Sequence, residues 1–128
     1  MKIYLTICCE KKNKDKGFIE AIDRYNYPRI NKVYNKSVGD GIDFRILSGK
    51  FGLLKANDKI PWYDNKLSKS SFRKLKEIVK TQLVKEKIKD ITFFMRDTRK
   101  NPEWKLYFNL VEEVCKELGI KLNVELVD

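Results

Sequence analysis

The stretch Asp90-Ile-Thr-Phe-Phe-Met-Arg96 decides the fold that we predict for this chain. Its β-branched and aromatic residues favour a β-strand. Apolar side chains occupy both faces of that strand, so both faces must be covered, as they are for central strands of parallel sheets. We therefore expect an α/β protein with residues 90–96 inside its sheet.

Outward from this strand, strand-like and helix-like segments alternate along the whole chain. The strands are expected at residues 2–8, 42–48, 90–96 and 120–127, and the helices at 18–24, 28–37, 68–83 and 101–118. The order βαβαβαβ predicts a mostly parallel four-stranded sheet with helices on its faces, a three-layer sandwich. No repeat or linker interrupts the pattern, so residues 1–128 are predicted to form a single domain.

Capping residues mark the ends of these helices. Ser68 is a candidate N-cap for the third helix, and Asn101 followed by Pro102 is typical of a helix start. Gly119 is a natural C-terminal cap for the last helix. The triplet Gly39-Asp40-Gly41 predicts a turn before the second strand.

Composition excludes several kinds of chemistry. The chain contains no histidine, which removes Ser-His and Cys-His pairs and most catalytic zinc sites. Its three cysteines, of which Cys8 and Cys9 are adjacent, indicate neither a disulfide framework nor a zinc site, so we expect a reducing cytoplasm. No apolar run approaches the roughly 20 residues of a membrane span, and no motif indicates a cofactor.

The net charge of +10 is concentrated in the middle of the chain. Residues 49–100 hold 15 Lys/Arg against 6 Asp/Glu, whereas residues 101–128 hold 3 against 6. A basic region of this kind suits a polyanionic partner such as nucleic acid or a nucleotide. A solvated, lysine-rich helix face explains the same charge equally well.

Polar side chains follow three of the predicted strands. Because parallel strands end at one edge of the sheet, where α/β proteins bind ligands, we expect three clusters to meet there. The candidate site residues are Cys8, Cys9, Lys12, Ser48, Gly49, Lys50, Gly52, Trp62, Tyr63, Asp64, Arg96 and Arg99.

The second cluster is the richest. Gly49 and Gly52 permit close backbone approach, so the amides of this turn could hold an anion beside Lys50. The spacing is not that of a Walker A loop, and a tight structural turn is the alternative. The rings of Trp62 and Tyr63, which follow this loop, could stack on a nucleobase or could belong to the core.

Asp64 is the candidate general base or electrostatic stabiliser, and its alternative role is to cap a turn.

Cys8 or Cys9, close to Lys12, could have a lowered pKa and act as a thiolate, or could simply pack under the sheet. Lys12, Arg96 and Arg99 are candidate phosphate ligands, although an exposed loop explains the two arginines as well.

The chain resembles a family of bacterial and archaeal domains of unknown function in two motifs. The first is Cys-Ser-x-x-Lys, present here as Cys8–Lys12 with Cys9 in place of serine. The second is Leu-Ser-Ala-x-Tyr-Gly-Leu-Leu followed by Ile-x-Pro-Tyr-Asp, present as residues 47–54 and 60–64. In the second motif Gly49 replaces alanine, Phe51 replaces tyrosine and Trp62 is inserted. The resemblance covers residues 1–85 well, and Tyr25 matches a tyrosine that this family carries in its first crossover.

The first motif is also similar to one in archaeosine synthase domains and, more loosely, to the uracil-DNA-glycosylase-like fold. That similarity implies a parallel α/β sheet and chemistry on a base or modified base. The histidine of the archaeosine synthase motif is absent here, so its reaction does not carry over.

Two functional hypotheses follow. In the first, the carboxyl edge of the sheet binds a nucleotide, nucleobase or nucleic acid, with Tyr63 or Trp62 stacking on the base and Asp64 supporting glycosidic or base-modifying chemistry. In the second, residues 66–100 make the protein a non-catalytic basic nucleic-acid-binding module. The sequence predicts no cofactor and leaves both catalysis and the oligomeric state open.

Overall fold

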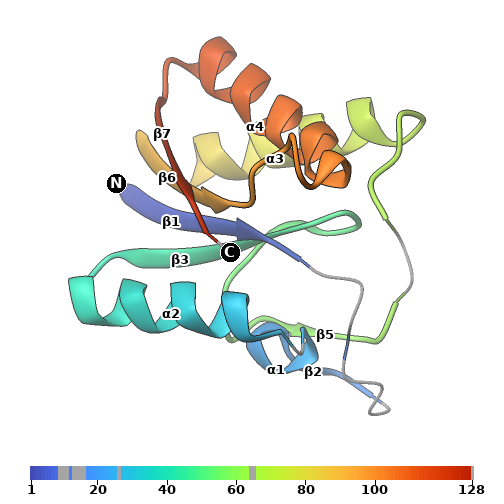
Figure 1. The fold of residues 1–128 in the computed structure, drawn as a ribbon, viewed down its shortest axis with the longest axis vertical. Coiled ribbons are helices and arrows are strands. Elements are labelled where there is room, and N and C mark those ends of the chain that lie inside the picture. The colour runs from blue at the N-terminus through green and yellow to red at the C-terminus, as the bar shows by residue number, and fades with distance from the viewer. Residues whose placement is uncertain (9–11, 13–16, 26, 64–65, 128) are drawn as a thin grey trace.

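The computed structural model describes residues 1–8, 12, 17–25, 27–63 and 66–127. They form a mixed α/β fold around a five-stranded central sheet (Figure 1). The strands are β1 (Lys2–Ile7), β3 (Asp43–Ser48), β4 (Gly52–Leu54), β6 (Asp90–Met95) and β7 (Lys121–Leu126), in the spatial order β4-β3-β1-β6-β7. Within this sheet, only the β3–β4 pair is antiparallel.

The mostly parallel sheet is confirmed, and residues 90–95 lie inside it between β1 and β7. The predicted number of four strands is wrong, because β4 adds a fifth. The chain reverses directly after β3, so that Ser48 pairs with Gly52 and Leu47 with Leu53. A three-residue strand is too short to give a periodic signal, which is why the sequence alone misses it.

Helices cover both faces of the sheet (Figure 1). The helices α1 (Ala21–Arg24) and α2 (Pro28–Asp40) lie on one face, and α3 (Phe72–Lys85) and α4 (Lys105–Leu118) lie on the other. A short 3₁₀ turn, η1 (Pro102–Trp104), precedes α4. The described part of the chain therefore has the expected three layers.

Several predicted helix ends differ in the structure. The second helix continues through Asp40, so the turn expected at Gly39-Asp40-Gly41 comes only at Gly41, which caps the helix at φ 68°. The third helix begins at Phe72, and Ser68 lies in the preceding turn, where it exchanges hydrogen bonds with Ser71. Gly119 caps α4 as predicted.

The segment expected to be a helix at 18–24 is partly extended. Its first residues form β2 (Ile19–Glu20), which pairs antiparallel with β5 (Lys59–Ile60). Only Ala21–Arg24 is helical. This small second sheet ties the first crossover to the chain that follows β4.

Two hydrophobic cores fill the spaces between the layers. One, between the sheet and α3 with α4, contains Leu75, Val79 and Leu110 packed on Ile3, Leu5 and Phe93. The other, between the sheet and α1 with α2, contains Ile30 and Val33 packed on Tyr4, Ile46 and Phe94. Burial of both faces of β1 and β6 explains their continuous apolar sequences.

The order of the strands creates a switch point between β1 and β6. The chain leaves β1 towards the α1–α2 face and leaves β6 towards the α4 face. In open α/β sheets, ligands usually bind at the carboxyl ends of strands whose connections diverge in this way. Within the described ranges, no helix combines the length and apolarity needed to cross a membrane.

Gly52 illustrates how tightly β4 packs against α3. Its φ is +74°, and an added Cβ would lie 2.5 Å from Gln82 Oε1 and 2.8 Å from Ile78 Cγ2. Gln82 is held there because its Oε1 accepts a hydrogen bond from the Leu53 amide at 2.7 Å. Gly52 therefore serves the contact between strand and helix.

We predict that Gly52→Ala lowers the free energy of unfolding by about 1–3 kcal/mol, because a side chain is strained at this φ and meets Gln82. Gly39→Ala is the matched control, since Gly39 is helical and a Cβ added there would meet no atom from outside its own helix within 4 Å. It should raise stability by about 0.5–1 kcal/mol. Urea denaturation of the three proteins measures both effects, and equal stability of Gly52→Ala and wild type would contradict the packing described.

Candidate functional site

The site is built around the turn that follows β3. The buried hydroxyl of Ser48 accepts hydrogen bonds from the amides of Lys50 and Phe51, each at 3.1 Å. A hydroxyl has two lone pairs and one proton, so both acceptor positions of Ser48 are filled. Its proton is therefore donated to Tyr63 Oη, which lies 2.9 Å away.

Tyr63 connects this turn to the first crossover. Its hydroxyl shares a hydrogen bond with that of Tyr25, which is fully buried. The ring of Tyr63 packs edge-on against Phe51, with centroids 5.1 Å apart, and is only 5% exposed. Tyr63 is thus a structural centre of the site and offers no free face for stacking on a base.

Two lysines lie over the same ring. Lys12 Nζ is 4.7 Å from the centroid of Tyr63, and Lys50 Nζ is 6.0 Å from it. These are cation–π distances. The loop after β1 and the turn after β3 therefore bring their positive charges to one place, as the sequence predicts.

Cys8 lies at the end of β1 beside this network. Its amide donates to Leu47 O at 2.9 Å, which extends the β1–β3 ladder by one residue. Its sulfur is 4.0 Å from Tyr107 Oη, and that hydroxyl accepts a hydrogen bond from the Leu67 amide at 3.2 Å. Cys8 therefore joins the tyrosines of both helical faces.

The pKa of Cys8 is raised, which corrects the expectation of a lowered one. Burial of the thiol is the dominant cause, and it outweighs the Gly49 amide, the Tyr107 hydroxyl and the charges of Lys12 and Arg29. At neutral pH the thiol keeps its proton. Cys8 is thus not a resting thiolate nucleophile.

Burial also raises the pKa of the three phenols around Cys8, namely Tyr25, Tyr63 and Tyr107. A charge on the sulfur would raise the pKa of each phenol further. All three hydroxyls therefore remain neutral hydrogen-bonding groups at physiological pH.

Aromatic and guanidinium groups link the end of β1 to the end of β6. Arg29 Nη1 donates to Thr6 Oγ1 at 2.7 Å and to Ile7 O at 3.1 Å. Its guanidinium lies 4.6 Å from the centroid of Trp104 and 5.2 Å from that of Tyr27. Arg96, directly after β6, donates to the Tyr27 hydroxyl.

The structure brings most of the predicted residues to one edge of the sheet. The hydrogen bonds and cation–π contacts described above link these residues to one another. They are Cys8, Lys12, Ser48, Gly49, Lys50, Tyr63 and Arg96. Cys9 and Asp64 lie outside the described residues, so their predicted roles remain predictions.

Three predicted residues stand apart from this group. Gly52 faces α3, and Arg99 is 87% exposed and paired with Asp97 at 2.9 Å. Trp62 is 46% exposed, so its ring is available to a partner. The solvated-loop interpretation therefore fits Arg99 better than a place in the crevice.

The expected anion cradle of backbone amides is wrong in its mechanism. The Lys50 and Phe51 amides donate to Ser48 Oγ, and the Gly49 amide interacts with the Cys8 sulfur. These donors are satisfied within the protein and do not point at a ligand. Among the described residues, lysine and arginine side chains are the groups of this edge that could bind an anion.

Sequence reasoning missed four residues that shape the site: Tyr27, Arg29, Trp104 and Tyr107. No local pattern distinguishes them, because Trp104 and Tyr107 lie within a helical run rich in apolar residues. Tyr107 meets Cys8 across 99 positions of sequence. Only the resemblance drew attention to Tyr25.

The described residues give this edge a positive charge. Lys12, Arg29, Lys50 and Arg96 lie around hydroxyls and a thiol that stay uncharged at neutral pH. In the part of the chain that the structure describes, histidine, cysteine and carboxylate side chains form no cluster of three that could hold a metal ion. This arrangement suits a small anion or a phosphorylated ligand.

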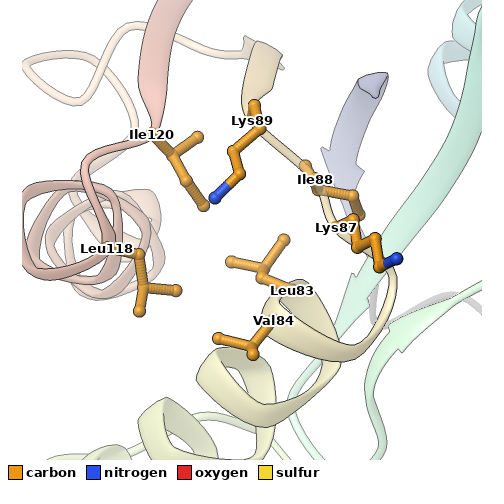
Figure 2. Close-up of a pocket in the computed structure, with 7 residues that line it drawn as sticks. All are labelled: Leu83, Val84, Lys87, Ile88, Lys89, Leu118 and Ile120. Atoms are coloured by element: carbon orange, nitrogen blue, oxygen red, sulfur yellow. The ribbon is translucent and has the colours of Figure 1, made fainter.

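A separate pocket lies at the opposite end of the sheet, next to the amino ends of β6 and β7 (Figure 2). Its volume is about 120 Å³. Its lining is mainly aliphatic, with Leu83, Val84, Leu118 and Ile120 beside Lys87 and Lys89. It shares no residue with the carboxyl edge.

No family model, curated protein or solved structure matches this chain. The function must therefore be argued from the geometry of the carboxyl edge.

We predict that Tyr63→Phe lowers the free energy of unfolding by about 1–3 kcal/mol, because the Ser48 proton and the buried Tyr25 hydroxyl both lose a partner. Tyr34→Phe is the control, since Tyr34 is half-buried and packs edge-on against Phe44 outside the network. It should cost less than about 0.5 kcal/mol. Thermal and urea denaturation compare the two variants. If Tyr63→Phe left the free energy of unfolding unchanged, the network would be excluded as a source of stability.

We expect Cys8 to alkylate slowly at pH 7.5 and to gain reactivity only at high pH. The test uses a Cys9→Ser/Cys115→Ala chain, which leaves Cys8 as the single thiol. Its rate should rise with a midpoint above roughly 8.5, the value of a free thiol. Because the unfolded thiol loses its proton first, the free energy of unfolding should also fall as pH rises past that value. A midpoint below 8 would contradict the burial that we assign to Cys8.

Proposed function

We propose that this protein binds a phosphorylated small molecule, a nucleotide in the first instance, at the carboxyl edge of its sheet. The observation that carries the proposal is the convergence of Lys12, Lys50 and Arg96 on an edge whose tyrosines and Cys8 are neutral. An anion entering this crevice gains attraction from the cations and meets no ionised phenol or thiolate among the described residues.

The chemistry of the rim favours a ligand that carries both a phosphate and a ring. Lysine and arginine provide charge-assisted hydrogen bonds to phosphate oxygens. The exposed ring of Trp62 offers a surface for stacking on a base. The resemblance to base-modifying domains supports the same class of ligand.

Catalysis is a further step of the proposal, and it depends on Asp64. A glycosidic or base-modifying reaction needs a carboxylate to act as base or to stabilise positive charge on the sugar. The protonated thiol of Cys8 is not suited to begin such a reaction. Asp64→Asn should leave ligand binding intact and abolish turnover of any substrate that is found.

A thermal-shift screen tests the binding proposal. The panel contains inorganic phosphate, nucleobases, nucleosides and nucleoside mono-, di- and triphosphates at one fixed ionic strength. We expect only phosphorylated compounds to raise Tm strongly, by roughly 10 °C when a ligand is present at about 100 times its Kd. Nucleosides that stabilise as well as their phosphates would contradict the proposed role of the cations.

Single charge removals locate the binding site. Lys50→Gln and Arg96→Gln should each weaken binding about tenfold or more, the loss of one charge-assisted hydrogen bond. Lys85→Gln is the matched control, because Lys85 is an exposed lysine at the far end of α3. Equal effects of the three substitutions would show that charge alone, and not the crevice, attracts the ligand.

The alternative of a basic nucleic-acid-binding module receives less support from the geometry. Lys76 pairs with Glu117 at 3.0 Å and with Glu113 at 3.3 Å, and Lys80 lies 3.8 Å from Glu117. These pairs neutralise part of the basic segment 66–100. Salt-dependent oligonucleotide binding that responds to Arg73→Gln and not to Arg96→Gln would favour this alternative.

A further inference from the structure

The outer edge of β7 is open in the described part of the chain. β7 lies at one end of the strand order and runs parallel to β6. The amide of Lys121 donates to Lys89 O at 3.0 Å, and that of Val127 donates to Met95 O at 2.8 Å. In a parallel strand, alternate residues point their backbone groups to opposite sides. The amides and carbonyls of Leu122, Val124 and Leu126 therefore point away from the sheet.

Apart from the charges of Lys121 and Glu125, the described edge lacks the features that usually protect one. It contains no proline, and Lys121–Leu126 is one regular strand of six residues. Val124 is 45% exposed and Leu126 is 60% exposed. A long edge with exposed apolar side chains is prone to pair with another strand.

We propose that a second copy of this chain pairs with β7 in antiparallel fashion, about a two-fold axis through Asn123. Charge complementarity selects both the partner and the register. In this register Lys121 lies opposite the partner's Glu125, and the symmetry repeats the pair. Both pairs occupy non-hydrogen-bonded positions, where facing side chains are closest.

A neighbouring register does not achieve this match. An axis through Val124 would place Asn123 opposite Glu125 and Lys121 opposite Val127, so that no opposite charges face each other. Both registers use the outward backbone groups of Leu122 and Val124. The charges therefore decide between two pairings that the backbone allows equally.

The proposed register also matches apolar side chains. Val124 lies beside the partner's Leu122, which packs at the margin of the α3–α4 core. Leu126 lies beside the partner's Ile120, a residue that lines the pocket in Figure 2. The exposed apolar side chains of one copy would thus contact apolar side chains at the margin of the partner's core.

The dimer would contain one continuous sheet built from two five-stranded sheets. Antiparallel pairing points the carboxyl edges of the two copies in opposite directions. Each candidate ligand site is then open to solvent, so the assembly does not depend on the proposed function.

Sedimentation equilibrium of the full chain tests the proposal with charge reversals. Wild type should form a dimer, and Lys121→Glu or Glu125→Lys should each weaken it about tenfold, because each turns two attractions into two repulsions. A mixture of the two single variants should dimerise as well as wild type, since each Glu then faces a Lys. The double variant Lys121→Glu/Glu125→Lys should do the same.

Val124→Pro is an independent variant. It removes an outward amide that takes no part in the β6–β7 ladder, so the fold should persist while the dimer dissociates. Circular dichroism checks the fold of each variant. The proposal would be overturned if wild type remained a monomer up to its solubility limit. It would also be overturned if neither charge reversal changed the Kd of the dimer.

Discussion

The hydroxyl of Ser48 holds the carboxyl edge of this protein together. By accepting from the Lys50 and Phe51 amides it fixes the turn after β3, and by donating to Tyr63 it anchors the chain that follows β5. Tyr63 in turn holds Tyr25 in the first crossover. Buried hydrogen bonds of this kind are costly to break, so one serine positions three segments that are distant in sequence.

The network also determines the charge state of the groups that it contributes to this edge. Burial keeps the phenols and the Cys8 thiol protonated, so they contribute hydrogen bonds and no negative charge. Among the described residues, the charges around them are those of lysine and arginine. The same burial that stabilises the site removes a resting thiolate from its chemistry, and it supports our proposal that the site binds an anion.

The sequence predicted the parts of the structure that depend on short-range pattern. Residues 90–95 were recognisable as an inner strand because both faces are apolar, and Lys50 and Arg96 were placed at one edge because each follows a parallel strand. β4 was missed because three residues carry no period and its position depends on contacts with α3. Local pattern also cannot give the direction of a pKa shift, which depends on tertiary burial.

Tyr63 illustrates, within the site, the same difference between what local pattern predicts and what tertiary contacts determine. Its place after β5 suggested an aromatic platform, and only its contacts with Ser48, 15 positions away, and Tyr25, 38 positions away, show it to be a buried anchor. Trp62, one residue earlier, remains exposed. Adjacent aromatic residues therefore have different roles that no composition rule separates.

The central claim is that the ends of β1, β3 and β6 form one anion-binding crevice. The most direct measurement is a ¹⁵N–¹H NMR titration with a nucleoside monophosphate, followed residue by residue. The account predicts saturable shifts at the amides of Cys8, Lys50 and Arg96, with the amides around the pocket at Lys87 and Ile120 unchanged. Shifts that spread along α3, or no saturation at millimolar ligand, would contradict it.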